Sequence, residues 1–261
     1  MTTQPEAPRP AATLITLRRP HAAAPTQVLM LVRSARMRFA GGACVFPGGG
    51  VDPADRTLAA ALPLPRGWDG LEDLAARIAA LRETLEETGL AIGFSRLDGQ
   101  PITQEDAARA RATLAQNVAL QPMLDQMGWR IEPQVLTPFA RWLPRLPRPY
   151  DTRFYLADLG TGAVSLSPDT QESQTLFWIT PQEALERADA GDLSIIFPTR
   201  RNLERLAQFA DFAQIRAHAL TTPLTTITPT VTQRDGASWL TIPEGLGYPV
   251  TGEPLDTARR G

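Results

Sequence analysis

The acidic segment at residues 82–89, RETLEETG, constrains this chain more than any other part of its sequence. Glu83, Glu86 and Glu87 stand at positions i, i+3 and i+4. On a helix such residues lie about 5–6 Å apart at Cβ, and like charges placed in this way repel. A hard divalent cation offsets that repulsion, because Mg²⁺ binds carboxylate oxygens together with substrate phosphates. The alternative is a solvated acidic face, the usual origin of an isolated Glu-Glu pair.

Apolar periodicity predicts the helix that carries these carboxylates. The helix is expected to start near Leu71 and to stop at Gly89, which suits the C′ position. Apolar side chains recur at i, i+4, i+7 and i+11, the pattern of a buried helical stripe. These are Leu74, Ile78, Leu81 and Leu85. The glutamates are therefore expected on a different face from the core.

A glycine-rich loop precedes this helix, with the sequence Phe46-Pro47-Gly48-Gly49-Gly50. The proline stiffens the entry, and the glycines permit close approach of the backbone to a neighbour. Taken alone, the loop is equally typical of an ordinary turn. Joined to the acidic helix, it favours a loop that brings a metal ion and a diphosphate together.

These two segments resemble the Nudix box, G-x5-E-x7-R-E-U-x-E-E-x-G-U, where U is a bulky apolar residue. The matching residues are Gly49-x5-Asp55 and Arg82-Glu83-Thr84-Leu85-Glu86-Glu87-Thr88-Gly89-Leu90. Three departures from the box pattern indicate one branch of the family. Asp55 replaces the usual Glu, Thr84 replaces an apolar residue, and the spacer at residues 56–81 has 26 residues instead of seven. Such a spacer is similar to that of the long-insert branch, which includes the mammalian peroxisomal coenzyme A diphosphatase.

The resemblance implies an α/β fold, a Nudix α/β/α sandwich with a mixed β-sheet and helical insertions. We expect one domain at residues 13–250, with inserts near 56–70 and 100–130. Residues 1–12 are expected to be a disordered tail and residues 251–261 a C-terminal tail. The resemblance also implies Mg²⁺ or Mn²⁺ as the cofactor.

The resemblance assigns roles to particular side chains. Glu83, Glu86 and Glu87 would be metal ligands, and Arg82 would orient a carboxylate of the box, Asp52 or Asp55. Nudix enzymes take the catalytic base either from the box helix or from a later loop. The candidates are Glu83 and Glu87 on the helix and Glu172 on the loop, with Asp169 in reserve. An exposed turn glutamate is the alternative reading of Glu172.

The only clue to the substrate lies just before the glycine loop. The spacing Ser34-x3-Arg38-x3-Gly42-x3-Phe46 is similar to the latter part of the coenzyme A signature, although Leu31 and Arg33 stand where threonines are expected. Arg33, Arg36 and Arg38 are candidates to bind the 3′-phosphate of coenzyme A, with Gly48 and Gly49 beside the diphosphate. A solvated basic turn is the alternative.

The resulting hypothesis is metal-dependent hydrolysis of coenzyme A or acyl-coenzyme A to 3′,5′-ADP and (acyl) phosphopantetheine. One rival is a diphosphatase acting on ADP-ribose or NADH. Another is a catalytically silent Nudix module that binds nucleotides as a regulator. The helical inserts could also form a homodimer interface.

Composition limits the other possibilities. Lys plus Arg number 26 and Asp plus Glu 28, so no overall field attracts nucleic acid or an anionic membrane. One cysteine, Cys44, cannot form an intrachain disulfide and is expected to be a small buried residue. Two histidines make a histidine-based triad or zinc site improbable. With no long apolar run, no signal peptide and no terminal S-K-L, we expect a cytoplasmic protein.

Local patterns predict the remaining elements. Strands are expected at residues 13–17, 27–32, 134–142, 152–159 and 175–179, and a surface excursion at 56–70. Helices are expected at residues 103–127, with a near capping box at Thr103, and at 200–220. Thr180 suits the N-cap of another helix, which makes Glu183 a capping residue. Asp235-Gly236 is expected to be a hairpin turn.

Overall fold

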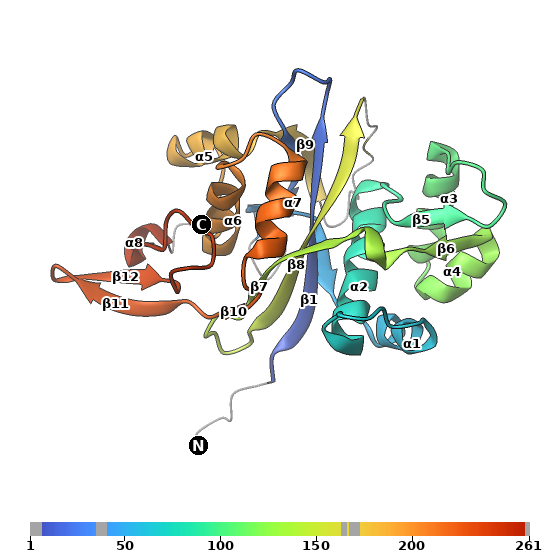
Figure 1. The fold of residues 1–261 in the computed structure, drawn as a ribbon, viewed down its shortest axis with the longest axis horizontal. Helices are drawn as coiled ribbons and strands as arrows, with labels where there is room; N and C mark the ends of the chain where they lie inside the picture. The colour runs from blue at the N-terminus through green and yellow to red at the C-terminus, as the bar shows by residue number, and fades with distance from the viewer. Residues whose placement is uncertain (1–6, 35–40, 163–165, 167–172, 259–261) are drawn as a thin grey trace.

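The computed structural model describes residues 7–34, 41–162, 166 and 173–258. Its centre is an eight-stranded mixed sheet with the order β10-β7-β8-β1-β2-β3, in which β4 also pairs with β1 and β9 with β2 (Figure 1). Pairs β1–β8 and β10–β7 are parallel, and the others are antiparallel. The strands are β1 (Arg9–Arg19), β2 (Gln27–Arg33), β3 (Cys44–Val45), β4 (Gly48–Gly50), β7 (Thr137–Trp142), β8 (Tyr150–Thr161), β9 (Ser173–Ile179) and β10 (Thr226–Ile227).

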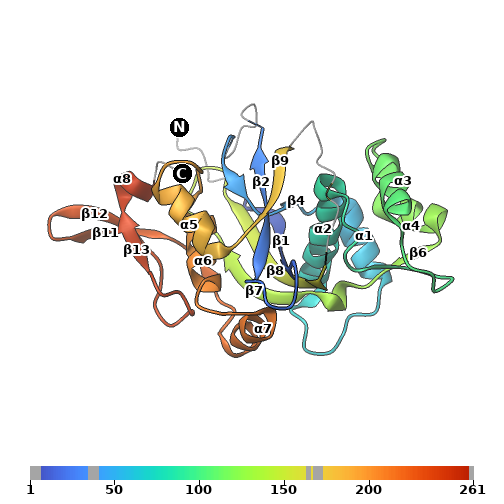
Figure 2. The same cartoon turned by 90° about the horizontal axis from the view of Figure 1, so that it is seen from above.

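Helices cover both faces of this sheet, which confirms the α/β/α sandwich (Figure 2). One face carries α1 (Pro53–Ala61), α2 (Gly70–Thr88), α3 (Gln104–Leu114) and α4 (Leu120–Met127). The other carries α5 (Pro181–Asp189), α6 (Phe197–Leu206) and α7 (Phe212–Thr221). Each face has its own core of buried apolar side chains. Strand β1 is covered on both faces between Ala11 and Leu17. Its sequence is therefore a nearly continuous apolar run and does not alternate between apolar and polar residues.

The box helix α2 forms as its periodicity predicts. Leu74, Ile78, Leu81 and Leu85 are all at most 2 % exposed. Gly89 ends the helix with φ of 75°, the left-handed conformation that glycine adopts without a Cβ penalty. The predicted caps at Thr103 and Thr180 are also confirmed, because their hydroxyls accept hydrogen bonds from backbone N–H groups at the starts of α3 and α5. At α5 the donor is the backbone N–H of Glu183, and capping by the Glu183 side chain stays a prediction.

Several predicted boundaries are wrong. The first strand begins at Arg9, inside the expected tail, because residues 9–12 pair with β8 and β4. Residues 53–61 form α1, since Asp52 and Asp55 make a capping box at its start; the expected surface excursion is confined to residues 62–69. The single helix expected at 200–220 is two helices, α6 and α7, because the Asp211 side chain caps a second N-terminus.

Three further segments complete the description. A short pair, β5 (Phe94–Arg96) and β6 (Trp129–Ile131), leads into the 3₁₀ turn η1 (Pro133–Val135). Strands β11 (Thr230–Arg234), β12 (Ala237–Thr241) and β13 (Gly252–Pro254) form a second sheet that projects beyond α6, followed by α8 (Leu255–Ala258) (Figure 1). Asp235 and Gly236 turn the β11–β12 hairpin, both with positive φ, as expected. Strand β13 and α8 replace most of the expected C-terminal tail. Among the described residues, every helix is too short or too polar to cross a membrane.

Candidate active site

A pocket of about 440 Å³ opens where β4, α2 and the start of α6 meet. Glycines of β4 and glutamates of α2 form one side. The other side is formed by residues from β2, β7, β8 and the start of α6. The lining includes Arg33, Gly48, Gly49, Glu83, Glu86, Glu87, Trp142 and Thr199.

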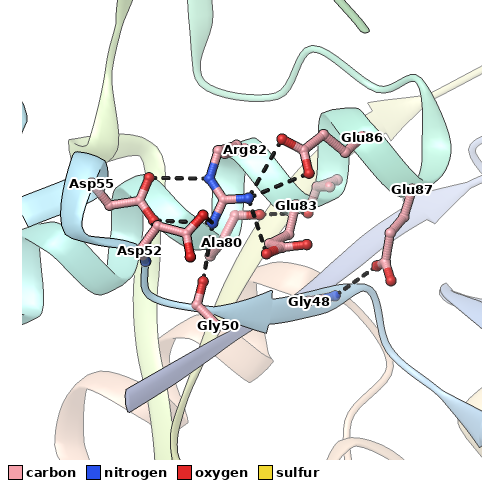
Figure 3. Close-up of polar contacts among 10 residues, drawn as sticks. Gly48, Gly50, Asp52, Asp55, Ala80, Arg82, Glu83, Glu86 and Glu87 are labelled. Atoms are coloured by element: carbon pink, nitrogen blue, oxygen red, sulfur yellow. Dashed lines mark hydrogen bonds and ion pairs between the residues drawn. The ribbon is translucent and has the colours of Figure 1, made fainter. Parts of the chain in front are cut away.

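Arg82 organises the acidic side of this pocket (Figure 3). Its Nε and Nη2 donate to the two carboxylate oxygens of Asp55 at 3.1 and 3.0 Å, a bidentate pair. Nη2 also donates to the Gly50 carbonyl at 3.0 Å. Nη1 donates to Glu83 at 3.0 Å and to Glu86 at 3.3 Å. One guanidinium thus ties the box helix to both α1 and β4.

The structure selects Asp55 as the main partner of Arg82. Asp55 is fully buried, whereas Asp52 lies 3.5 Å from Arg82 with a largely exposed side chain. The Asp55 carboxylate also accepts from the Asp52 N–H at 2.9 Å. Burial by itself lowers the pKa of Arg82, but the hydrogen bonds that Arg82 donates to Asp55 and the negative charges around it outweigh burial and raise that pKa. Arg82 is therefore a permanent cation beneath the glutamates.

The glycines of β4 allow the glutamates to approach the backbone. A Cβ at Gly49 would collide with the Glu83 carboxylate, and a Cβ at Gly48 would collide with β1 at Ala12. The Gly48 N–H donates to the Glu87 carboxylate at 2.8 Å, and Glu87 is only 5 % exposed. A larger residue at Gly48 would force β4 away from β1, and one at Gly49 would displace the Glu83 carboxylate.

Glu86 is the most exposed of the three glutamates, at 30 % of its side chain. Burial raises its pKa, and the positive charge of Arg82 offsets only part of that effect. Three carboxylates around one cation leave a net negative site. Such a site attracts a second cation.

The donor set suits a hard divalent metal, because Glu83, Glu86 and Glu87 offer only oxygen ligands and line one pocket. Their present partners differ, since Glu83 and Glu86 bind Arg82 whereas Glu87 binds Gly48. Within the described ranges, no three Asp, Glu, His or Cys side chains are already arranged to hold a metal ion. Coordination by all three glutamates would require side-chain rotation.

The predicted substrate residues are only partly described. Arg33 lines the pocket, and its buried Nε has no hydrogen-bond partner among the described residues. Arg36, Arg38, Glu172 and the reserve Asp169 lie outside the described residues. Cys44 is buried, and burial raises the pKa of its thiol to about 12, which leaves it protonated and unreactive.

Sequence reasoning missed the wall opposite the glutamates. Trp142 comes from the end of β7, and its ring packs edge-on against Phe197 at the start of α6. Trp142 ends the strand expected at residues 134–142, but no local pattern indicated that its ring lines a pocket. Thr199 had no local signal, since only the fold brings α6 to the pocket.

Comparison with known proteins agrees with this geometry. A Nudix hydrolase from Alicyclobacillus acidocaldarius superposes with a TM-score of 0.68 and 28% sequence identity, covering 81% of this chain and 96% of that one. The acyl-coenzyme A diphosphatase NUDT19 of Gallus gallus is 28% identical over 233 residues, and that of Xenopus laevis is 25% identical over 235. These matches cover 70% and 72% of this chain.

Fold, box and relatives together support a Nudix hydrolase-like protein. Among Nudix hydrolases, the chain is similar to acyl-coenzyme A diphosphatases of vertebrates. No family model matches the chain. The match spans 62% of the length of each of those two relatives.

Proposed function

We propose that this protein is a metal-dependent diphosphatase that cleaves coenzyme A or acyl-coenzyme A to 3′,5′-ADP and (acyl) phosphopantetheine. The observation that carries the proposal is the pocket shared by three box glutamates, the β4 glycines and Arg33. The names of the vertebrate relatives supply the substrate class.

The chain's own residues divide the work. Glu83, Glu86 and Glu87 would hold Mg²⁺ or Mn²⁺, which when bound neutralises phosphate charge and lowers the pKa of water. Arg82 keeps the Glu83 and Glu86 carboxylates in place and is itself fixed by Asp55. Gly48 and Gly49 keep the backbone close to the diphosphate. The base that takes a proton from the attacking water is Glu83 or Glu87 on α2, or Glu172 on the later loop.

A substrate panel tests this proposal. Coenzyme A, acetyl-coenzyme A, ADP-ribose and NADH are each incubated with Mg²⁺, Mn²⁺ or a chelator, and the products are identified by mass. We expect 3′,5′-ADP and phosphopantetheine from the coenzyme A substrates, and no products with the chelator. Faster hydrolysis of ADP-ribose or NADH would favour the second diphosphatase class. Binding without hydrolysis of any substrate would favour a nucleotide-binding regulator.

Location and assembly belong to the same proposal. We expect a cytoplasmic enzyme, tested by cell fractionation. The α3–α4 insert is the candidate for a homodimer interface. Sedimentation of the wild-type protein tests it, since a single monomeric species at all concentrations would exclude that interface.

A further inference from the structure

The start of α6 forms the wall of the pocket across from the glutamates. Ile196, Pro198 and Thr199 all line the pocket. Helices α3, α5 and α7 are capped by side-chain oxygens of Thr103, Thr180 and Asp211, as described above for their N-termini. The N-cap of α6 is Ile196, which has no oxygen to offer. The first N–H groups of α6 therefore have no side-chain cap.

An uncapped helix start is an anion site only if other groups support it. The N–H groups of Phe197 and Thr199 occupy positions N1 and N3, where a helix supplies no internal acceptor. Pro198 between them has no N–H to satisfy. The helix dipole adds positive potential at the same end.

Thr199 provides a second, independent indication of a ligand. It is 3 % exposed and lines the pocket, yet its hydroxyl has no hydrogen bond within the described part of the chain. Threonines on α2 behave differently, because Thr84 and Thr88 donate to the carbonyl four residues earlier at 2.7 and 2.6 Å. A hydroxyl that lines a pocket and has no protein partner is suited to hydrogen-bond a ligand.

Arg33 lies on the same side of the pocket, next to the segment that leads into α6. Strand β3 connects the two, because the Arg33 N–H donates to the Ala43 carbonyl at 3.0 Å and the Cys44 N–H to Ser194 at 2.7 Å. The Arg33 Nε is buried without a partner among the described residues. Arg33, Thr199 and the start of α6 thus line the same pocket as the carboxylates.

We propose that Thr199, Arg33 and the start of α6 form a second anion subsite, which binds a phosphate monoester of the substrate. This inference rests on the proposed function, since the glutamate wall then takes the diphosphate. The 3′-phosphate of coenzyme A is a monoester of this kind. Thr199 is accordingly a specificity-determining residue, and it discriminates 3′-phosphorylated substrates from those that lack this group.

The test compares two substrates within each variant. The kcat/KM ratio for coenzyme A over 3′-dephospho-coenzyme A is measured for the wild type, Thr199→Val and Thr199→Ser. We expect Thr199→Val to lower this ratio about tenfold, the effect of one hydrogen bond to a charged group, and Thr199→Ser to retain it. Arg33→Gln should lower it at least as much, and Arg33→Lys less. A partial folding defect lowers both rates by the same factor and leaves the ratio unchanged, because both substrates are measured with one preparation of each variant.

An unchanged ratio in both Thr199→Val and Arg33→Gln would overturn the subsite. If the wild type hydrolyses neither substrate, the proposed function fails but the subsite is still measurable. Calorimetry then measures the binding affinities of 3′,5′-ADP and 5′-AMP, which test the subsite without any hydrolysis. Preference of the wild type for 3′,5′-ADP, lost in Thr199→Val and kept in Thr199→Ser, would support the subsite. Equal affinity of the wild type for both nucleotides would contradict it.

Discussion

Two buried ion networks flank the pocket, one between α1 and α2 and one between α6 and β13, and they differ in how completely their polar groups are paired. In the first, Arg82 meets Asp55, Gly50, Glu83 and Glu86, and none of its described polar atoms lacks a partner. In the second, Arg201 donates to Glu204 at 2.8 Å and to Glu253 at 3.0 Å.

The α6 network remains incomplete among the described residues. Buried atoms there without a partner include Arg201 Nε, Asn202 Nδ2 and Glu204 Oε2. Burial lowers the pKa of Arg201 and raises that of Glu204 to about 7. The box network therefore pairs its described polar groups, whereas the α6 network leaves some buried groups unpaired and carries a desolvation cost that depends on pH.

Replacing a box glutamate should produce the largest effect. Glu87→Gln removes a charge from the pocket and weakens the acceptor of the Gly48 N–H. We expect kcat/KM to fall about 10²- to 10⁴-fold, the usual contribution of one base or charge-stabilising group. Steady-state kinetics with Mg²⁺ measures this effect. The matched control is Glu183→Gln at the start of α5, which should keep wild-type rates; full activity of Glu87→Gln would refute the catalytic assignment.

Breaking the box network should cost the most stability. Asp55→Asn keeps the shape of the side chain but leaves Arg82 buried beside an uncharged partner. We expect the free energy of unfolding to fall by about 3–5 kcal/mol, as for other buried pairs that lose one member. Urea unfolding followed by circular dichroism measures it. A loss below about 1 kcal/mol, as in an exposed pair, would show that the α1–α2 network is not a stabilising unit.

The α6 network should make the free energy of unfolding depend on pH. The pKa of Glu204 is about 7 in the folded protein, against an ordinary value of 4.5 for a solvated glutamate, so the folded state binds the extra proton. Stability from this group is full below pH 4.5 and is lost as pH rises through 7. We expect wild-type unfolding free energy to fall by about 2–3 kcal/mol more than that of Glu204→Gln between about pH 5 and pH 8. Parallel pH profiles of the two proteins would contradict this account.

An exposed ion pair near the box should contribute least. Arg56 and Glu72 connect α1 to α2 at 3.1 Å, with side chains 37 % and 60 % exposed. Water screens this pair, so Arg56→Gln should change the free energy of unfolding by no more than about 0.5 kcal/mol. Comparison of the stability losses in Arg56→Gln and Asp55→Asn shows whether burial of an ion pair, or only its position next to α2, sets its contribution. A loss as large as that of Asp55→Asn would mean that position, and not burial, sets the energy.

Much of the fold could be predicted because its signals are local. The α2 stripe, the stop at Gly89 and the turn at Asp235 each depend on residues within a few positions of one another. The predicted boundaries were wrong where two local sequence signals favoured different structures for the same residues. Apolar spacing favoured one helix at residues 200–220, but the Asp211 side chain starts a new one. Proline-rich composition favoured an excursion after residue 55, but the Asp52–Asp55 capping box favours α1.

The residues of the candidate site also fall into those predicted from local sequence and those identified only in the fold. The sequence by itself determined the acidic half, since Glu83, Glu86 and Glu87 share a helix face through backbone geometry alone. It left Arg82 with two possible partners, and the tertiary structure decided for Asp55, whose burial makes the pairing strong.

Only the tertiary structure brought Thr199 and Trp142 to the pocket, whereas the sequence had already indicated Arg33. These residues are distant in sequence, and no short-range pattern records which strand ends and helix starts meet. Their meeting follows from the sheet order and from the packing of α6 on Trp142. Local spacing thus specifies chemistry on one element, whereas burial of two apolar cores decides which elements share a pocket.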